Sequence, residues 1–196
     1  NHANQTIRRS PLFDRQQANM GTTVAVVLTR GYEAIVAHVG DSRVYLMRDD
    51  ELRQLSHDHS LVEDLVRDGR ITAEEAKVHP QRNILTRALG IDLDVDVDGA
   101  SLLPLAGDRF LLCSDGLFNE VSLDQMSAVL RRLVDPDEAA AELVRLANEG
   151  GGRDNITVVL VDVIDDDGRS AAIAEAQAAA VAAAEARAAA ERAEAE

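Results

Sequence analysis

The chain has 196 residues, of which 46% are apolar and 28% charged, so we expect a globular domain with a buried core and exclude a disordered or fibrous chain. Its net charge of −15 disfavours binding to nucleic acid or to an anionic membrane surface. No run of about 18 apolar residues occurs, which excludes a membrane-spanning helix. The single cysteine, Cys113, allows no internal disulfide, so we expect a reducing, cytoplasmic location.

The first third of the chain predicts a short helix and then a meander of antiparallel strands. Residues 1–10 are expected to contain the end of a helix. Runs of β-branched and apolar residues separated by Gly31 and by Asp49-Asp50 are typical of strands joined by tight turns. The predicted strands cover 22–28, 33–39, 43–47 and 52–55.

The middle of the chain predicts short helices, and the pattern then returns to strands. Ser60 with Glu63 and Thr72 with Glu75 have the spacing of capping boxes. Two later helices are expected to begin after Ser122 and Asp135. Further strands are predicted at 95–97, 109–113 and 156–163. Strands at both ends with helices between them indicate an α+β domain.

The composition changes near Asp165. Residues 171–196 contain sixteen alanines in twenty-six positions, and from residue 165 onward eight acidic side chains face three arginines. Because alanine has the highest helix propensity, we expect 165–196 to be an acidic tail that is either helical or disordered. A solvated helix or linker and a partner-binding coiled coil both stay open, although large side chains at coiled-coil positions are few.

Three acidic corners lie where predicted strands end: Gly40-Asp41-Ser42-Arg43, Ser114-Asp115-Gly116 and Gly151-Gly152-Arg153-Asp154-Asn155. Taken singly, each corner is the ordinary chemistry of a turn. Taken together, they allow Asp115, after one strand, to approach Asp154, before another. Two close carboxylates repel each other unless a cation or a proton intervenes, and a donor set made only of oxygen favours Mg²⁺ or Mn²⁺.

With three further motifs, these corners resemble the metal-dependent Ser/Thr protein phosphatases of the PPM, or type 2C, family, particularly the bacterial members. The further motifs are Met20-Gly21-Thr22-Thr23, Asp58-His59-Ser60, and His79-Pro80-Gln81-Arg82-Asn83 followed by Arg87-Ala88-Leu89-Gly90. The resemblance runs in order over about 5–164, and it identifies 57–90 as the flap-like helical insert of a partial phosphatase domain at 1–164.

The resemblance implies a two-layer antiparallel β-sandwich flanked by helices, with Mn²⁺ or Mg²⁺ ions bound at one end. In the family, water held by two metals hydrolyses phosphoserine and phosphothreonine in proteins, and a third ion binds more weakly. Carried over by motif, Asp115 and Asp154 become metal ligands, and Asp41 helps Asp115 to hold the third metal. Asn83 lies where a backbone carbonyl reaches that third ion. Asn155 is expected to orient Asp154, and Arg43 to pair with nearby acids or carbonyls.

The sequence departs from the family pattern before Met20, where no glycine-rich Asp-Gly stretch occurs. That stretch supplies the aspartate that bridges both metals, and the family's phosphate-binding arginine also lies upstream. We therefore expect the chain to be the C-terminal two thirds of a domain, inactive as printed and with open sheet edges. Three functions stay open. The first is a protein phosphatase acting on phosphorylated proteins, and the second is a non-catalytic module of the same fold that binds a Ser/Thr kinase or another regulator. The third is a hydrolase of small phosphate esters, which shares the metal chemistry.

Other candidate groups are assigned to structure. His57, Asp58 and His59 are adjacent, so their side chains diverge, and we expect surface or capping roles for them. His38 is expected to be structural. Cys113 lies in an apolar strand without a readable base, which predicts a buried, inert thiol.

Overall fold

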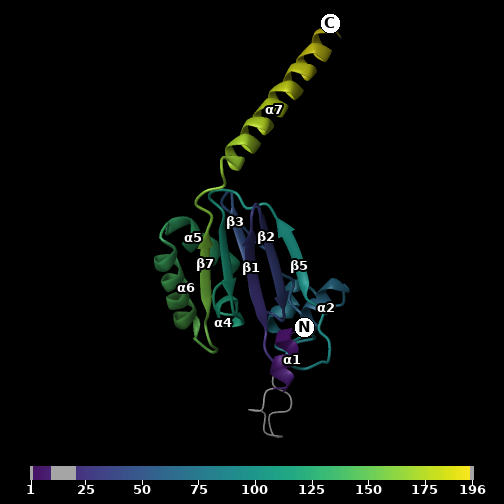
Figure 1. Cartoon of the computed structure of the whole chain (residues 1–196), viewed down its shortest axis with the longest axis vertical. Coiled ribbons are helices and arrows are strands. Elements are labelled where there is room, and N and C mark those ends of the chain that lie inside the picture. The colour runs from purple at the N-terminus through teal and green to yellow at the C-terminus, as the bar shows by residue number, and fades with distance from the viewer. Residues whose placement is uncertain (1, 10–20, 195–196) are drawn as a thin grey trace.

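The computed structural model describes residues 2–9 and 21–194, with side chains described up to residue 182. Within that part of the chain, seven strands form two antiparallel sheets (Figure 1). One sheet has the order β1 (Val24–Arg30), β2 (Glu33–Val39), β5 (Asp98–Leu102). The other has the order β4 (Glu51–Gln54), β3 (Arg43–Arg48), β6 (Arg109–Cys113), β7 (Val158–Asp162). This is the α+β sandwich that the sequence predicted.

Helices flank the two sheets and one extends away from them. They are α1 (His2–Arg9), α2 (Leu61–Arg67), α3 (Ala73–Val78), α4 (Asp115–Phe118), α5 (Leu123–Arg132), α6 (Pro136–Gly150) and α7 (Arg169–Glu194). The predicted N-terminal helix is confirmed as α1. The alanine-rich tail is helical as α7, which leaves the body at one end of the sandwich (Figure 1).

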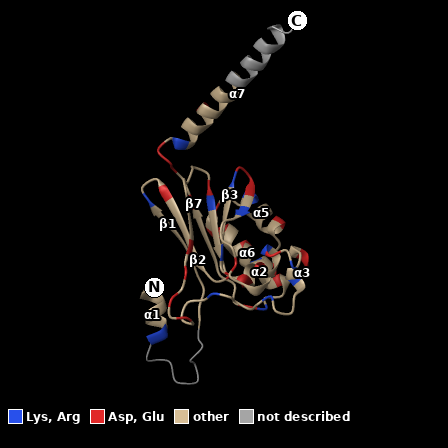
Figure 2. Ribbon diagram, turned by 90° about the vertical axis from the view of Figure 1, so that its right-hand side faces the viewer, with Lys and Arg blue, Asp and Glu red and all other residues tan. Residues whose placement is uncertain are grey.

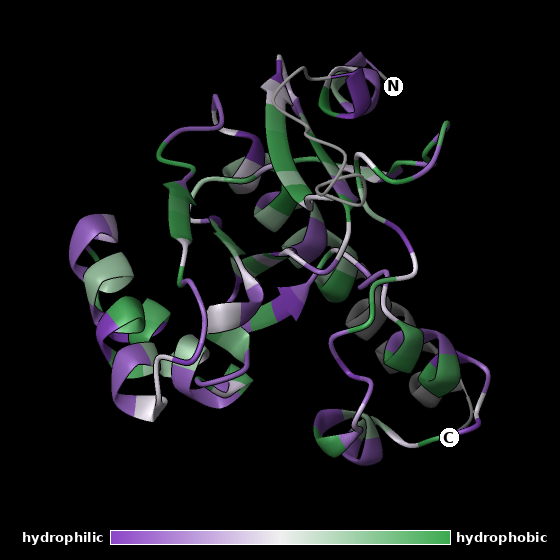
Figure 3. Ribbon diagram, turned by 90° about the horizontal axis from the view of Figure 1, so that it is seen from below, coloured by the Kyte–Doolittle hydropathy of each residue, from purple (hydrophilic) through white to green (hydrophobic). Residues whose placement is uncertain are grey.

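Apolar side chains fill both faces of the four-stranded sheet. Between the sheets lie Ala34, Val36, Val44, Leu46 and Phe110. On the opposite face, Tyr45, Leu111 and other apolar residues of β3 and β6 pack against α4, α5 and α6. Seen from below, hydrophobic residues concentrate in the strands and hydrophilic residues in the outer turns (Figure 3). The shared core fixes where the strands end, and the strand ends carry the acidic corners.

The predicted strand positions hold best where a run of apolar residues is continuous. Strand 33–39 is found as predicted, and 109–113 likewise. The predicted strand 22–28 begins at Val24, because Thr22 instead forms an isolated bridge with Leu89. The strand predicted at 156–163 is confined to 158–162.

The prediction of a strand at 95–97 is wrong, because the strand in this region is β5, which begins at Asp98. Val95 is buried with Val39 and Leu89, outside any ladder. The β5 sequence Asp-Gly-Ala-Ser-Leu has low intrinsic strand preference and is extended because it pairs with β2 over Ala34 to His38. The position of this strand therefore depends on pairing with β2, which the local sequence pattern does not reveal.

The helix starts follow the local signals closely. Both bonds of the capping box are present at Thr72 with Glu75 and at Ser122 with Gln125. Asp135 caps α6 by accepting a hydrogen bond from the backbone N–H of Glu138. At Ser60 only half of the predicted box forms, since its hydroxyl accepts from the Glu63 N–H without the return bond.

The end of the sandwich where α7 begins contains two buried acids, Asp108 and Asp166, whose carboxylates accept several hydrogen bonds. Asp108, 2% exposed, accepts hydrogen bonds from Arg48 Nε at 2.7 Å, Arg48 Nη2 at 2.6 Å and the backbone N–H of Leu105 at 2.8 Å. Asp166, 3% exposed, accepts from the backbone N–H groups of Ala106 and Ser170. These bonds fasten the first turn of α7 to the body.

β1 and β7 lie at the open edges of their sheets, where exposed Val26, Leu28, Val159 and Val161 form two short apolar strips. Charged side chains gather instead at the strand ends and in the connecting loops (Figure 2). Open edges of this kind are what the sequence led us to expect.

Candidate metal centre

Three turns meet at the end of the sandwich that lies opposite α7. They are the β2–β3 turn with Asp41, the β6–α4 junction with Asp115, and the segment with Asp154 that precedes β7. The register brings them together, because Arg43 pairs with Cys113, and Cys113 pairs with Val158 across the sheet. The first residue of β3, the last of β6 and the first of β7 thus form one row.

A set of hydrogen bonds joins the β6–α4 junction to the segment before β7. Ser114 Oγ donates to the Asn155 carbonyl at 2.8 Å and accepts from the Thr157 N–H at 3.0 Å. The Ser114 N–H also donates to the Thr157 carbonyl at 3.2 Å. Gly116 packs so closely that a Cβ there would lie 2.5 Å from the Asn155 carbonyl oxygen. Asp154 is consequently held beside Asp115.

The carboxyl groups at this end repel one another. Burial, followed by the charge of Asp154, raises the pKa of Asp115. Burial, followed by the charges of Asp115 and Asp58, raises the pKa of Asp41 to about 6. Each shift records a carboxylate that is partly removed from water and lies near another acid. No Lys or Arg forms an ion pair with Asp41, Asp115 or Asp154 in the described part of the chain.

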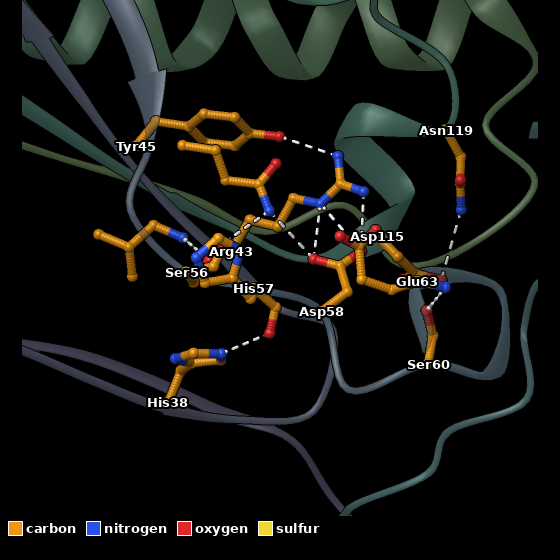
Figure 4. A network of polar contacts seen from close by, with 12 residues as sticks. His38, Arg43, Tyr45, Ser56, His57, Asp58, Ser60, Glu63, Asp115 and Asn119 are labelled. Atoms are coloured by element: carbon orange, nitrogen blue, oxygen red, sulfur yellow. Dashed lines mark hydrogen bonds and ion pairs between the residues drawn. The ribbon is translucent and has the colours of Figure 1, made fainter. Parts of the chain in front are cut away.

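The guanidinium of Arg43 is engaged elsewhere (Figure 4). It donates to both carboxylate oxygens of Asp58, with Nη2 to Oδ2 at 2.7 Å, and Nη1 donates to the Tyr45 hydroxyl at 3.0 Å. Its carbon lies 3.5 Å from the centre of the Phe118 ring. The expected pairing of Arg43 with a nearby acid is confirmed. The contact holds the positive charge against Asp58, so Arg43 attenuates but does not cancel the charges of Asp41 and Asp115.

The chemistry of the donors fits a hard divalent cation. Asp41, Asp115 and Asp154 offer only oxygen atoms, and oxygen is what Mg²⁺ and Mn²⁺ prefer. A bound cation would remove the repulsion that raises the pKa values of Asp41 and Asp115. The donor chemistry therefore suits a metal, but in the described residues the ligand atoms of these three aspartates do not all lie within 4.8 Å of one another, so their role as ligands stays a prediction.

Comparison with known proteins gives the chain a family. The family model described as protein phosphatase 2C matches residues 1–156. The chain belongs to the protein phosphatase 2C family. It is 41% identical over 154 residues to "Protein phosphatase PhpP" of Streptococcus pneumoniae, covering 79% of this chain and 63% of that protein. It is 45% identical over 143 residues to "Serine/threonine phosphatase stp" of Listeria innocua, covering 73% and 57%.

Solved phosphatase structures share the fold. The crystal structure of the serine/threonine phosphatase PstP/Ppp of Mycobacterium tuberculosis superposes with a TM-score of 0.78 at 41% identity, covering 83% of this chain and 68% of that one. A structure of the PstP catalytic domain in complex with two manganese ions gives a TM-score of 0.75 at 40% identity, covering 83% and 67%. The chain thus spans less than two thirds of the length of the PhpP and Stp relatives.

Three predictions about this phosphatase 2C chain concern residues outside the carboxylate group. Asn83 lies in an exposed turn after α3, and no described hydrogen bond or ion pair joins its side chain to Asp41 or Asp115, so its role as a carbonyl ligand stays a prediction. Met20 of the Met-Gly-Thr-Thr motif lies outside the described residues. Cys113 is buried, and burial raises the pKa of its thiol to about 12, which confirms the expected inert cysteine.

The assignment of His59 to a surface or capping role is wrong, because its side chain is buried and stacks on His38 with 4.7 Å between ring centres. One ligand atom each of His38, His59 and Asp98 lies within 4.8 Å of the others. No sequence pattern indicated this group, since the residues are far apart in the chain. Only the family motif containing His59 could have drawn attention to it. No helix in the described residues has the length and apolar composition to cross a membrane.

Proposed function

We propose that this chain forms the C-terminal part of a metal-dependent protein phosphatase domain that hydrolyses phosphoserine and phosphothreonine in proteins. The supporting observation is that three carboxylates, Asp41, Asp115 and Asp154, lie at one end of the sandwich and that no cationic side chain of the described residues forms an ion pair with them. The names of the relatives, which are protein or serine/threonine phosphatases, support the substrate class.

Asp115 and Asp154 would hold one Mn²⁺ or Mg²⁺ ion. Asp41 and Asp115, with the carbonyl of Asn83, would hold a weaker third ion. When bound, the ions would lower the pKa of a bound water, so that hydroxide becomes available to attack phosphorus, and they would supply positive charge for the phosphate oxygens. The bonds of Ser114 fix the spacing of Asp115 and Asp154, and the contact with Asp58 keeps the Arg43 guanidinium from occupying the cation position.

The sequence before Met20 contains no glycine-rich Asp-Gly stretch, and the resemblance to the family implies that this stretch, with the bridging aspartate, and the phosphate-binding arginine precede the matching region. We therefore propose that this chain alone binds Mn²⁺ weakly and does not hydrolyse a phosphothreonine peptide, whereas the domain extended upstream does. A cytoplasmic location and a Ser/Thr kinase as partner stay predictions.

Manganese binding to this chain tests the metal assignment directly. Paramagnetic Mn²⁺ should broaden the NMR signals of Asp41, Asp115 and Asp154 selectively, and Asp154→Asn should weaken the broadening at Asp115. The exposed acid Asp94 gives the matched control, as Asp94→Asn should leave the pattern unchanged. Broadening spread over all surface acids without preference would contradict the proposed centre.

Activity of the extended domain tests the reaction. With Mn²⁺ it should release phosphate from a phosphothreonine peptide. Tight binding of a Ser/Thr kinase without any phosphate release would instead support the non-catalytic module. A preference for small phosphate esters over phosphopeptides would contradict the proposed substrate class.

A further inference from the structure

The buried imidazole of His59 lies between the acidic Gly40–Asp41 turn and the segment in which the helical insert returns to the sandwich. We propose that His59 is a positioning residue that couples the Gly40–Asp41 turn to this return segment, Thr86–Arg87, and to Asp98 at the start of β5. Its relevance to the metal centre rests on the proposed function, because Asp41 is a metal ligand only there.

On one side, His59 forms two hydrogen bonds with the backbone of Gly40, one through its own backbone N–H and one through its ring. The His59 N–H donates to the Gly40 carbonyl at 3.0 Å, and the Gly40 N–H donates to His59 Nδ1 at 3.1 Å. Gly40 has φ of +104°, and a Cβ there would lie 2.3 Å from Thr23 Cγ2. Thr23 in turn contacts the Ser42 hydroxyl at 2.8 Å. The residues on both sides of Asp41 are therefore held.

On the other side, His59 faces the return segment and β5. Because Nδ1 accepts the hydrogen bond from the Gly40 N–H, it carries no hydrogen, and the ring hydrogen is assigned to Nε2. Burial also lowers the pKa of His59. Nε2 lies 3.1 Å from Asp98 Oδ2 and 3.0 Å from Arg87 Nη1, which also pairs with Asp98 Oδ1. The Thr86 N–H donates to the His59 carbonyl at 2.9 Å. A single residue thus contacts both segments.

The alternative interpretation of this group as a second metal site is unfavourable. His59 Nδ1 already accepts from Gly40, and Nε2 faces both the Asp98 carboxylate and the Arg87 guanidinium, so the described contacts leave the ring no free position for a metal. His38 Nε2 lies 2.7 Å from the His57 carbonyl, a contact visible in Figure 4. The Arg87 guanidinium already supplies the positive charge beside Asp98. The polar atoms of His38, His59 and Asp98 are thus used in contacts that join segments of the protein, which disfavours a metal site here.

Hydrogen exchange of this chain without metal tests the coupling. In Asp98→Ala, which does not touch Gly40, the exchange of the Gly40 and His59 amides should accelerate about tenfold or more, since the ring loses the carboxylate that orients it. His59→Asn should do the same, because an asparagine oxygen can accept from the Gly40 N–H but is too short to reach Asp98.

The matched control is Asp96→Ala, since only the backbone carbonyl of this exposed residue meets Arg87. It should leave the Gly40 amide unchanged. Faster exchange at Thr86 and Arg87 with no change at Gly40 in Asp98→Ala would overturn the proposal. An equal acceleration at Leu111, in the centre of β6, would also overturn it, because that result reports general destabilisation.

Adding Mn²⁺ separates this proposal from the proposed function. If both hold, Asp98→Ala weakens Mn²⁺ broadening at Asp41 more than at Asp154. If the unaltered chain shows no broadening at either residue, the metal centre fails, while the metal-free exchange at Gly40 still decides the coupling. Equal broadening at Asp41 in the unaltered chain and in Asp98→Ala would overturn the positioning role.

Discussion

The two ends of the sandwich treat their acidic residues in opposite ways. Beside α7, Asp108 receives three hydrogen bonds, two of them from Arg48, and Asp166 receives two from the backbone, which lower its pKa. At the far end, the pKa values of Asp41 and Asp115 are raised by burial and by neighbouring acids. The first end uses its carboxylates to hold the fold together. The second loses stability through them, as expected of groups kept for binding a cation.

The largest effect is expected when the acids at the far end, Asp41, Asp115 and Asp154, are replaced. In the upstream-extended domain, Asp115→Ala or Asp154→Ala should lower the rate of phosphopeptide hydrolysis by several orders of magnitude, because a catalytic ion loses a ligand. Asp41→Ala should lower it less. Equal losses for all three variants would contradict the division of roles, and Asp94→Ala should keep the full rate.

At the end beside α7, replacing a buried acid should change the free energy of unfolding. Asp108→Ala should reduce the free energy of unfolding by about 3 kcal/mol, because Arg48 and the Leu105 N–H lose a buried charged acceptor. Urea denaturation followed by circular dichroism measures this. Mn²⁺ broadening at Asp115 should be unaffected in the folded variant, and a lost metal response would show that the two ends are not independent.

A smaller effect of opposite sign is expected at Asp41. Its pKa is raised to about 6, so its ionised form opposes folding, and the favourable contribution of the protonated form is lost as pH rises through that value. Asp41→Asn should therefore stabilise the metal-free chain by about 1–2 kcal/mol at about pH 8, after allowance for partial exposure. The gain should shrink on acidification from about pH 6 to about pH 4. Urea midpoints across this range measure it, and a gain that is independent of pH would contradict the assignment.

The smallest effect concerns the base of α7. Asp166→Ala should lower the free energy of opening the first turn of α7 by about 1 kcal/mol, since the N–H groups of Ala106 and Ser170 lose their acceptor. Hydrogen exchange should show faster exchange in the first turn of α7 and no change in β6. The exposed acid Asp94, whose side chain makes no described hydrogen bond, gives the control, because Asp94→Ala should leave the exchange of both regions unchanged.

What the sequence predicts well is encoded over short distances. The capping boxes at Thr72 and Ser122 need only residues three positions apart, and the apolar run within 33–39 is enough to define β2. The family motifs also pointed to the acidic corners, which the strand register then brings to one end.

What the sequence could not reveal depends on distant partners. β5 is a strand because it lies beside β2, despite its weak preference. His59 is buried because Gly40, Arg87 and Asp98 converge on it from different segments. The docking of α7 through Asp166 needs the turn at Ala106, sixty residues earlier. None of these contacts leaves a periodic trace in the chain.

The burial of Cys113 makes its alkylation rate a measure of how often strand β6 separates from its neighbours. This residue, the only cysteine in the chain, is paired with both Arg43 and Val158 and lies two positions before Asp115. Because burial raises the pKa of its thiol to about 12, an alkylating reagent can label it only after β6 separates from its neighbours. The labelling rate of unmodified protein therefore times the opening of the carboxylate end, with no introduced dye or tag.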